Sequence, residues 1–428
     1  MASATFRSFT GRNFRLFFLG ALVSNVGTWM GRTAQAWLVL VELTEHSAPA
    51  LGLVTALQFL PMVLLAPWAG LIADRFAKRR ILTLTQGSMA LIQLVTGLLI
   101  ITGTATLALV YLLTFLLGAA SAIDAPARQA FVSEVVGPDL LSNAIGLNSA
   151  NFNAARLVGP GLAGLLIAVI GTGGVFLLSA VTFAAIITSL WAMNPALIDA
   201  APKVRGRGRL REGLTYVAHR PDILLIFAIV FLLGTFGMNF QMTTALMATT
   251  VYERGPKDYG ILGSVMAVGS LAAALLAARR SRPRLRTILL ALAAFALANT
   301  AAALAPSYEL FAVLLVPVGL AALTVLPTAN SIVQLAVEPE MRGRVMSLYM
   351  AIFMGGTPVG APLLGWVGER YGARWTLLAG SLAAVLALVI ALVHLVGFGG
   401  VRVRYRRGVT PRFAVTRVGA TPHPEVTP

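Results

Sequence analysis

The sequence predicts an all-α polytopic membrane protein with twelve transmembrane helices, arranged as two parallel repeats of six. Three observations support this prediction. Only 11% of the 428 residues are charged and 57% are hydrophobic, whereas soluble domains carry about 25% charged residues. Apolar runs of about 20 residues, each long enough to cross a bilayer as a helix, follow one another along nearly the whole chain. Finally, a shift of 201 residues aligns motifs of the second half with motifs of the first half.

Charged residues, prolines and glycines divide the apolar sequence into its candidate spans. These cover residues 14–41, 50–72, 81–101, 106–124, 142–170, 173–193, 223–250, 259–279, 287–305, 309–336, 344–367 and 373–397. They predict an N-terminal six-helix bundle (1–194), a cytoplasmic linker (195–222), a C-terminal six-helix bundle (223–397) and a basic, disordered cytoplasmic tail (398–428). Within the linker, LREGLTYVAHR fits a short amphipathic helix on the membrane surface. It fits equally a basic segment that only fixes topology.

The distribution of cations predicts the orientation. Cytoplasmic loops of membrane proteins are enriched in Lys and Arg. With the N-terminus inside, most of the 33 Lys and Arg residues lie in inner segments, and only Arg254, Lys257, Arg370 and Arg374 lie in outer loops. We therefore expect a multi-pass membrane protein with both termini cytoplasmic. The net charge of +17 then indicates contact with anionic lipids of the cytoplasmic leaflet rather than with nucleic acid.

The internal repeat is supported by several matches at one offset. Pro126 aligns with Pro327, Gly171 with Gly372, and VGPGLAG at 158–164 with VGAPLLG at 359–365. Two six-helix halves in the same orientation form the parallel-repeat plan of transporters, in which the substrate site lies near the midplane between the halves.

The stretch GLIADRFAKRR at 70–80 resembles the loop signature of the major facilitator superfamily. The residues that carry the resemblance are Gly70, Asp74, Arg75, Lys78, Arg79 and Arg80. The resemblance implies a gating loop that latches the two halves in the outward-open state, with the aspartate at a helix N-terminus, where a carboxylate is stabilised. Alternatively, the four cations only hold the loop on the cytoplasmic side.

A second motif, ARLVGPGLAG at 155–164, resembles the antiporter motif of the exporter branches of that superfamily, through Gly159, Pro160, Gly161 and Gly164. Proline removes a helix hydrogen bond and kinks the span, and small residues let a neighbouring helix approach closely. The motif therefore favours export, although close packing without any directional role also accounts for it.

Three further segments are similar to the bacterial branch that contains the enterobactin exporter and the transmembrane secretion effectors. They are 30–44, 121–136 and 338–349, and the resemblance extends to about residue 400. It implies a monomeric, proton-coupled exporter in a bacterial inner membrane. Its cargo would be amphipathic small molecules, of siderophore or drug type, moved by alternating access. The alternatives are an uncoupled facilitator or importer, and a sensor or scaffold that transports nothing.

Two arginines lie inside predicted spans, where a charge is costly and indicates a functional role. Arg156 is at the midpoint of its span, whereas Arg32 is near enough to the outer surface to extend its charge to it. The nearest acids are Asp124 and Glu42, at span ends. We expect Arg156 to contact an anionic substrate group. Asp124 is the first candidate for the proton-coupling residue, titrating against Arg156 or the substrate.

Amide side chains on the same spans predict a polar path, although each alone is more often a helix-to-helix hydrogen bond. They are Asn25, Gln35, Gln58, Asn148, Asn151, Asn239, Gln241, Asn330 and Gln334. The sequence contains no cysteine, no phosphate-binding loop and only four scattered histidines. We therefore expect no enzyme activity, no metal site and no cofactor.

Overall fold

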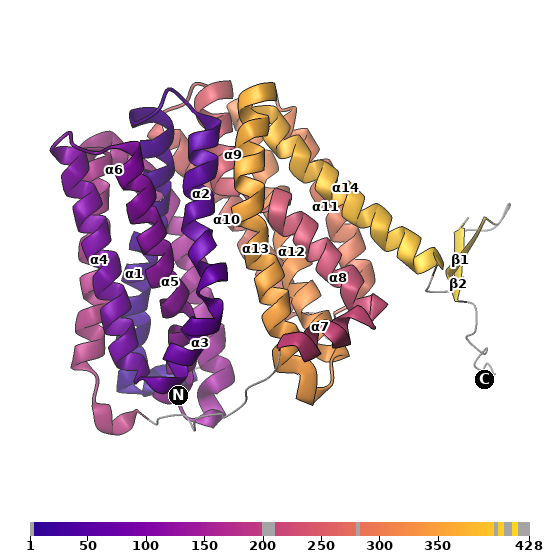
Figure 1. Cartoon of the computed structure of the whole chain (residues 1–428), viewed down its shortest axis with the longest axis horizontal. Helices are drawn as coiled ribbons and strands as arrows, with labels where there is room; N and C mark the ends of the chain where they lie inside the picture. The colour runs from indigo at the N-terminus through magenta and orange to yellow at the C-terminus, as the bar shows by residue number, and fades with distance from the viewer. Residues whose placement is uncertain (1–3, 199–209, 280–282, 398–400, 406–412, 418–428) are drawn as a thin grey trace.

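The computed structural model of the chain describes residues 4–198, 210–279, 283–397, 401–405 and 413–417. Most of these residues are helical, and the helices form two groups that stand side by side (Figure 1). The first group consists of η1 (Ala4–Thr10), α1 (Arg12–Trp37), η2 (Leu38–Glu42), α2 (Ala48–Leu64), α3 (Ala66–Arg75), α4 (Lys78–Ile101), α5 (Leu107–Val135), η3 (Pro138–Leu140), α6 (Leu141–Ala192) and η4 (Pro195–Leu197). The second group consists of α7 (Leu210–Ala218), α8 (Pro221–Leu232), η5 (Leu233–Gly237), α9 (Phe240–Leu246), η6 (Met247–Val251), α10 (Pro256–Ala278), α11 (Leu285–Ala303), α12 (Tyr308–Ala336), α13 (Pro339–Tyr371) and α14 (Ala373–Gly397).

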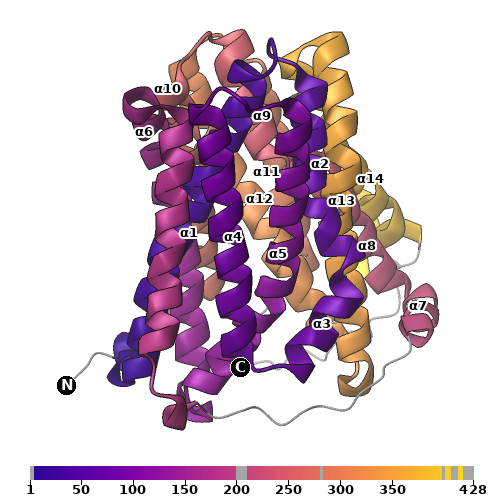
Figure 2. The same ribbon diagram turned by 60° about the vertical axis from the view of Figure 1, so that its left-hand side comes forward.

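The helices are long and apolar enough to make this a multi-pass membrane protein. Within the described ranges, nine helices could cross a membrane by length and composition, and the pair α2 and α3, bent by 58°, would bring the number to ten. The bend is visible at the lower right of Figure 2. Large apolar side chains such as Leu84 and Leu297 project outward from them. A helix suits this environment because its backbone hydrogen bonds are satisfied within the segment.

Two glycines divide long helical stretches between consecutive predicted spans. The structure has α6 as one helix over the predicted spans 142–170 and 173–193, broken at Gly171, whose φ is 71°. Gly372, with φ at 95°, separates α13 from α14. Glycine adopts positive φ without the steric cost that a Cβ brings, so the chain reverses at these points without a longer loop.

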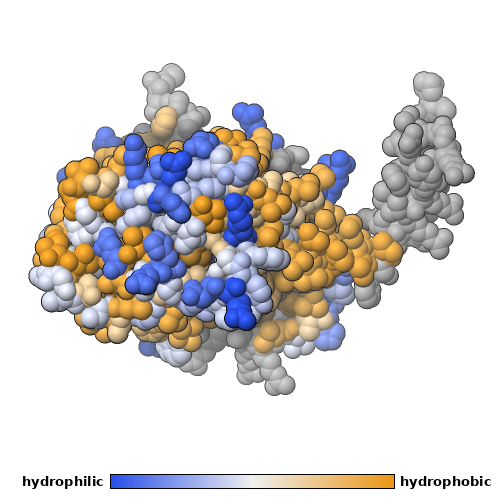
Figure 3. All heavy atoms as spheres, turned by 90° about the horizontal axis from the view of Figure 1, so that it is seen from above, coloured by the Kyte–Doolittle hydropathy of each residue, from blue (hydrophilic) through white to orange (hydrophobic). Residues whose placement is uncertain are grey.

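The loops at the two ends of the bundle differ in charge. We call the basic end the one where α3 meets α4, because it carries Arg75, Lys78, Arg79 and Arg80. The opposite end, at the top of Figure 1, contains the loops after η2 and before α10. Seen from this opposite end, polar residues gather over the middle of the face and apolar residues surround them (Figure 3).

A pocket of about 460 Å³ opens at the opposite end between Glu45 and His46 on one side and Glu369 and Arg374 on the other.

The two groups of helices approach each other through glycines near the opposite end. A Cβ added at Gly52 of α2 would lie 2.5 Å from the carbonyl oxygen of Ala361 in α13, and one at Gly365 would lie 2.7 Å from that of Ala48. Nearer the basic end, a Cβ at Gly355 would meet only a Val63 methyl group, at 3.9 Å. The helices α2 and α13 therefore diverge toward the basic end.

The predicted linker and tail are partly outside the described residues, at 199–209, 398–400, 406–412 and 418–428. In the linker, α7 occupies the segment expected to be an amphipathic helix, and Glu212 forms an ion pair with Arg344 at 2.8 Å. In the tail that we expected to be disordered, the structure has two antiparallel strands, β1 (Val401–Tyr405) and β2 (Phe413–Arg417).

Candidate functional site

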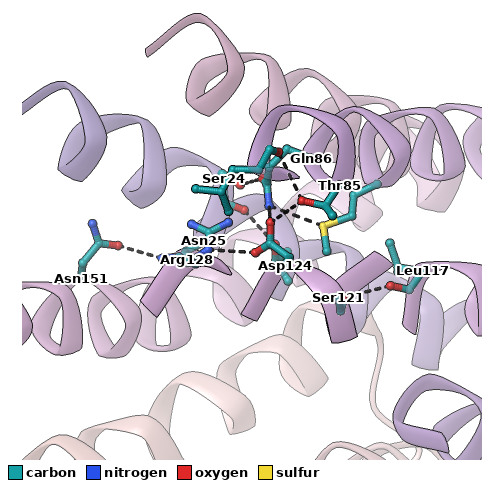
Figure 4. Close-up of polar contacts among 12 residues, drawn as sticks. Ser24, Asn25, Thr85, Gln86, Leu117, Ser121, Asp124, Arg128 and Asn151 are labelled. Carbon is teal, nitrogen blue, oxygen red and sulfur yellow. Dashed lines mark hydrogen bonds and ion pairs between the residues drawn. The ribbon is translucent and has the colours of Figure 1, made fainter. Parts of the chain in front are cut away.

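A buried polar network centred on Asp124 links three helices of the first group (Figure 4). Asp124 is 6% exposed. Its Oδ1 accepts hydrogen bonds from Thr85 Oγ1 at 2.7 Å and from Gln86 Nε2 at 2.8 Å, both on α4. Its Oδ2 pairs with Arg128 Nε at 2.9 Å, one turn later on α5. Ser24 on α1 donates to Gln86 Oε1 at 2.8 Å. We call these five residues the Asp124 network.

The Asp124 network concentrates charge in a place where charge is expensive. Removing one partner of a buried ion pair costs about 3–5 kcal/mol, because the other charge is left uncompensated. In addition, Arg128 Nη1 is buried and has no hydrogen-bond partner in the described structure. The network therefore holds a carboxylate whose acceptor capacity is well used, together with a guanidinium that retains an unused donor. The structure places Asp124 against Arg128 rather than against Arg156.

Five of the predicted amides form hydrogen bonds to other side chains, mostly between helices. Asn25 on α1 donates to Asn151 Oδ1 on α6 at 3.0 Å, and Asn151 donates to the Phe18 carbonyl at 2.8 Å. Gln35 donates to Thr114 Oγ1 at 2.5 Å. Each of these bonds satisfies a polar group between spans, which is the ordinary use of an amide in a membrane helix bundle. The fourth and fifth, Asn330 and Gln334, hydrogen-bond each other at 2.6 Å along α12.

The other four amides are less fully engaged. Asn239 donates to the Thr235 carbonyl at 2.7 Å, but its Oδ1 is buried without a partner in the described structure, as is Gln241 Nε2. Gln58 and Asn148 are not among the buried residues. Asn25 and Asn151 belong to the first group of helices and Asn239 and Gln241 to the second, and the described residues show no hydrogen bond between the two pairs.

The two arginines inside spans meet at one tryptophan. The Cζ of Arg32 lies 5.2 Å and the Cζ of Arg156 5.6 Å from the ring centre of Trp29. Arg32 also lies 5.7 Å from the ring of Phe59 on α2. Neither guanidinium has a carboxylate partner among the described residues. Cation–π contacts are worth about 0.5–2 kcal/mol each. Both arginines are only half-buried, and their N–H donors have no hydrogen-bond partner among the described residues.

The gating-loop residues divide into paired and exposed ones. Lys78 forms an ion pair at 3.0 Å with Glu134 of α5, whose side chain is only 6% exposed. Arg79 donates to the Trp191 carbonyl at 3.2 Å. The remaining charged members, Asp74, Arg75 and Arg80, are exposed. Across the described residues, Asp74 has no hydrogen bond or ion pair to the second group of helices, and a Cβ at Gly70 would meet nothing within 4 Å.

The antiporter-like motif lies at the contact between α6 and α10. Gly161 donates its backbone N–H to Ser264 Oγ at 3.0 Å. A Cβ at Gly164 would collide with the Pro256 carbonyl and come within 3.0 Å of Gly260, which itself lies against the Pro160 carbonyl. Gly159 faces the other way, where a Cβ would lie 2.5 Å from Trp29 Cβ. The motif therefore packs α6 tightly against both α1 and α10.

A family model described as transmembrane secretion effector matches residues 3–399, almost the entire chain. The chain belongs to this family of major facilitator superfamily transporters. Relatives include the multidrug efflux pump Tap of Mycolicibacterium fortuitum, 28% identical over 88% of this chain and 94% of that protein. The staphyloferrin A transporter of Staphylococcus aureus is 25% identical over 61% of this chain and 66% of that protein. Membership places the chain among transporters rather than enzymes.

Solved structures support the same fold. A bacterial homologue of the human lysosomal transporter Spinster, in an inward-facing and unoccupied conformation, superposes with a TM-score of 0.73 at 16% identity, covering 88% of this chain and 96% of that one. The nucleoside transporter NupG gives a TM-score of 0.69 at 14% identity, covering 90% of this chain and 99% of that one. At such identities the likeness shows the major facilitator fold alone.

Sequence reasoning missed several residues that complete these sites in this secretion-effector family member. Arg128 could have been predicted as a partner of Asp124, because residues four apart lie on one face of a helix. The roles of Thr85, Gln86 and Glu134 could not, because they depend on how α4 packs against α5. Trp29 precedes Arg32 by three residues and could have been recognised as its neighbour for the same reason as Arg128.

Proposed function

We propose that this transporter exports amphipathic small molecules, of siderophore or drug type, in exchange for protons. The observation that carries the proposal is the Asp124 network, which holds a buried carboxylate in a helix bundle of transporter fold. The similarity to a multidrug efflux pump over nearly its whole length supports export. The antiporter-like contact at Gly161 and Gly164 supports the same direction.

Proton coupling would operate through the pairing of Asp124 with Arg128. An ionised Asp124 holds the Arg128 guanidinium and the α4 side chains in place. When Asp124 takes up a proton, the ion pair with Arg128 is lost, and the network that joins α1, α4 and α5 loosens. An intramembrane carboxylate that cycles between these states is the usual element of a proton relay. Proton binding thus shifts the balance between two arrangements of the first half.

Alternating access would follow from the glycine contacts between the halves. The close approaches at Gly52, Gly164 and Gly365 hold the opposite end closed, while α2 and α13 diverge toward the basic end. If the basic end faces the cytoplasm, this arrangement is inward-open. The exposed Asp74 fits it, because the gating loop is expected to latch only in the outward-open state.

The topology that accompanies this mechanism has twelve spans. The broken helix α6 would supply two of them, α1 with η2 another, and α2 with α3 one bent span. The matching positive φ angles of Gly171 and Gly372 support the parallel repeat. We place the protein as a monomer in a bacterial inner membrane, with both termini and the basic end in the cytoplasm, where the cations contact anionic lipids.

The proposal is tested by comparing cells and everted membrane vesicles that carry the wild-type chain, the Asp124→Asn variant or no transporter. A panel of drugs and secreted metabolites identifies the cargo by its retention in cells without the gene. In everted vesicles, an imposed proton gradient should drive accumulation of that cargo by the wild type and not by Asp124→Asn.

Three other outcomes would overturn the proposal. Transport that ignores the gradient would indicate an uncoupled facilitator, and accumulation inside wild-type cells would indicate an importer. Unchanged distribution of the entire panel in all strains would indicate a sensor or scaffold. Uphill transport by Asp124→Asn would remove Asp124 from the coupling step while leaving export in place.

A further inference from the structure

The packing of the first half does not explain why two cations, Arg32 and Arg156, lie beside Trp29 without a counter-charge. Arg32 comes from α1 and Arg156 from α6, and both are half-buried. They lie on the same indole ring, close enough for their charges to repel each other. No hydrogen bond from either guanidinium to a described residue is present. Two like charges gathered at one ring, away from acids, create a local excess of positive potential.

Aromatic side chains surround this excess charge. The ring of Phe152 on α6 meets Trp29 edge to face, with centroids 5.8 Å apart. Phe59 lies beneath Arg32 on the side of α2. Phe152 is 48% exposed despite its position within a span. The cluster therefore presents two unpaired guanidinium groups beside apolar ring surface, and it draws residues from three helices.

We propose that Trp29, Arg32, Phe59, Phe152 and Arg156 form a cargo site for an amphipathic anion that carries two oxyanion groups, or one bidentate one, on an aromatic or other apolar body. This inference rests on the proposed transport function and specifies its substrate class. Guanidinium groups bind carboxylate, sulfonate and phosphate oxygens through paired N–H donors. The rings supply contact for the apolar body. The anion neutralises the two cations that the described part of the protein leaves unpaired.

The Asp124 network and this cargo site are connected through α1 and α6. Asn25 lies one turn before Trp29 and hydrogen-bonds Asn151, which lies more than one turn before Arg156. Ser24, the neighbour of Asn25, donates to Gln86 of the Asp124 network. Movement of α1 that accompanies proton uptake at Asp124 therefore reaches the cargo site directly. This gives the exchange of a proton for an anion a structural route.

The test measures binding to the purified full chain in uncharged detergent by isothermal titration calorimetry. The probe is 5-sulfosalicylate, which has two oxyanions on one ring, and salicyl alcohol is its uncharged counterpart. Wild-type protein should bind the dianion, and Arg32→Gln and Arg156→Gln should each weaken binding by about tenfold to a hundredfold, as expected for losing a hydrogen bond to a charged group. Arg156→Lys should recover part of the affinity, because it restores charge without the planar fork.

Arg254→Gln is the matched control, because Arg254 is paired with Glu309 at the opposite end, outside the site. It should bind the dianion as the wild type does. If a glutamine variant fails to fold, thermal unfolding of the wild type provides the second measurement. Its midpoint should rise with 5-sulfosalicylate concentration and stay unchanged with salicyl alcohol.

Several results would overturn the assignment. They are equal binding of both probes, absence of dianion binding to the wild type at millimolar concentration, and unchanged binding in both glutamine variants. A lipid phosphate could supply the same oxyanion. Phosphatidylglycerol that co-purifies with the wild type, is lost from both glutamine variants and is not displaced by 5-sulfosalicylate would therefore also exclude cargo. Since binding is measured without a gradient, failure here leaves the vesicle result standing, and failure in vesicles leaves this site standing.

Discussion

The two halves of the molecule are alike in their backbone and unlike in their buried charge. The helices α5 and α12 begin and end at residues that correspond at a shift of 201, and Thr106 and Ser307 cap them in the same way, by accepting a hydrogen bond from the backbone N–H three residues later. At the same shift, Gly164 and Gly365 both pack against a helix of the other group. The two halves therefore share helix ends, helix caps and glycine contacts between helices.

The chemistry differs at corresponding positions. Asp124 corresponds to Val325 and Arg128 to Ala329, and both counterparts are fully buried and apolar. Glu134 corresponds to Leu335 and Arg156 to Thr357. The only buried acids of the described structure, Asp124 and Glu134, are thus both in the first half. The difference teaches that the two halves share a backbone frame but not its buried charges. The groups that we propose for proton coupling and anion binding all lie in the first half.

The largest effect is expected from Asp124→Asn. It leaves Arg128 buried without its counter-charge, so the free energy of unfolding should fall by about 3–5 kcal/mol, and gradient-driven export should be lost. The double variant Asp124→Asn with Arg128→Gln removes both charges. It should recover most of the stability in thermal unfolding without recovering export.

The control for this prediction is Val325→Asn, the corresponding position of the second half. It should retain gradient-driven export if it folds. Equal loss of coupling in Asp124→Asn and in a folded Val325→Asn would show that the two halves share the coupling role, which would break the comparison.

Substitution of the contact glycines should slow export in both halves. Leucine at Gly164 collides with the Pro256 carbonyl, and leucine at Gly365 collides with that of Ala48. Overpacking costs about 1–3 kcal/mol. Because both collisions occur where the two halves meet at the opposite end, this cost destabilises the state in which that end is closed. Both variants should therefore export several-fold more slowly. Gly146→Leu, on the same helix α6 but with nothing within 4 Å, is the control. A transport defect in only one of the two contact variants would show that the glycine contacts of the two halves do not play equivalent roles.

The ion pair between Lys78 and Glu134 should have a smaller effect, mainly on stability. Glu134→Gln leaves the Lys78 ammonium without its partner, at a cost of about 1–3 kcal/mol. Chemical denaturation should show this loss, and Lys78→Met combined with Glu134→Met should recover most of it. If the double variant is as unstable as the single one, the pair does not stabilise α4 against α5.

The smallest effect on stability is expected from Asp74→Asn. The side chain is exposed in this structure, and surface substitutions usually change stability by less than about 0.5 kcal/mol. Export should nevertheless slow, because the latch that we propose for Asp74 forms only in the outward-open state. Calorimetric unfolding measures the effect on stability, and initial efflux rates measure the effect on export. A destabilised Asp74→Asn protein would mean that Asp74 already has a partner in the state described here.

The fold was largely predictable from sequence, because apolar runs, glycines and cation clusters obey local rules. The break at Gly171 and the resemblance carried by residues 70–80 are of this kind. The partners of Asp124 were not predictable to the same degree. Arg128 follows from helical periodicity, but Thr85 and Gln86 reach Asp124 only through the packing of α4 on α5. The meeting of Arg32 and Arg156 at Trp29 likewise depends on the close contact of α1 and α6 at Gly159.

The most direct test measures distances between spin labels at both ends of the bundle, at acid and at neutral pH. The chain has no cysteine, so labels can be placed at Leu71 and Ser347 near the basic end, and at Thr104 and Tyr371 at the opposite end. In the wild type and in Val325→Asn, we predict that the two distances change with pH in opposite directions. In Asp124→Asn, we predict that neither distance changes. Distances that ignore pH in the wild type, or that respond in Asp124→Asn as in the wild type, would contradict it.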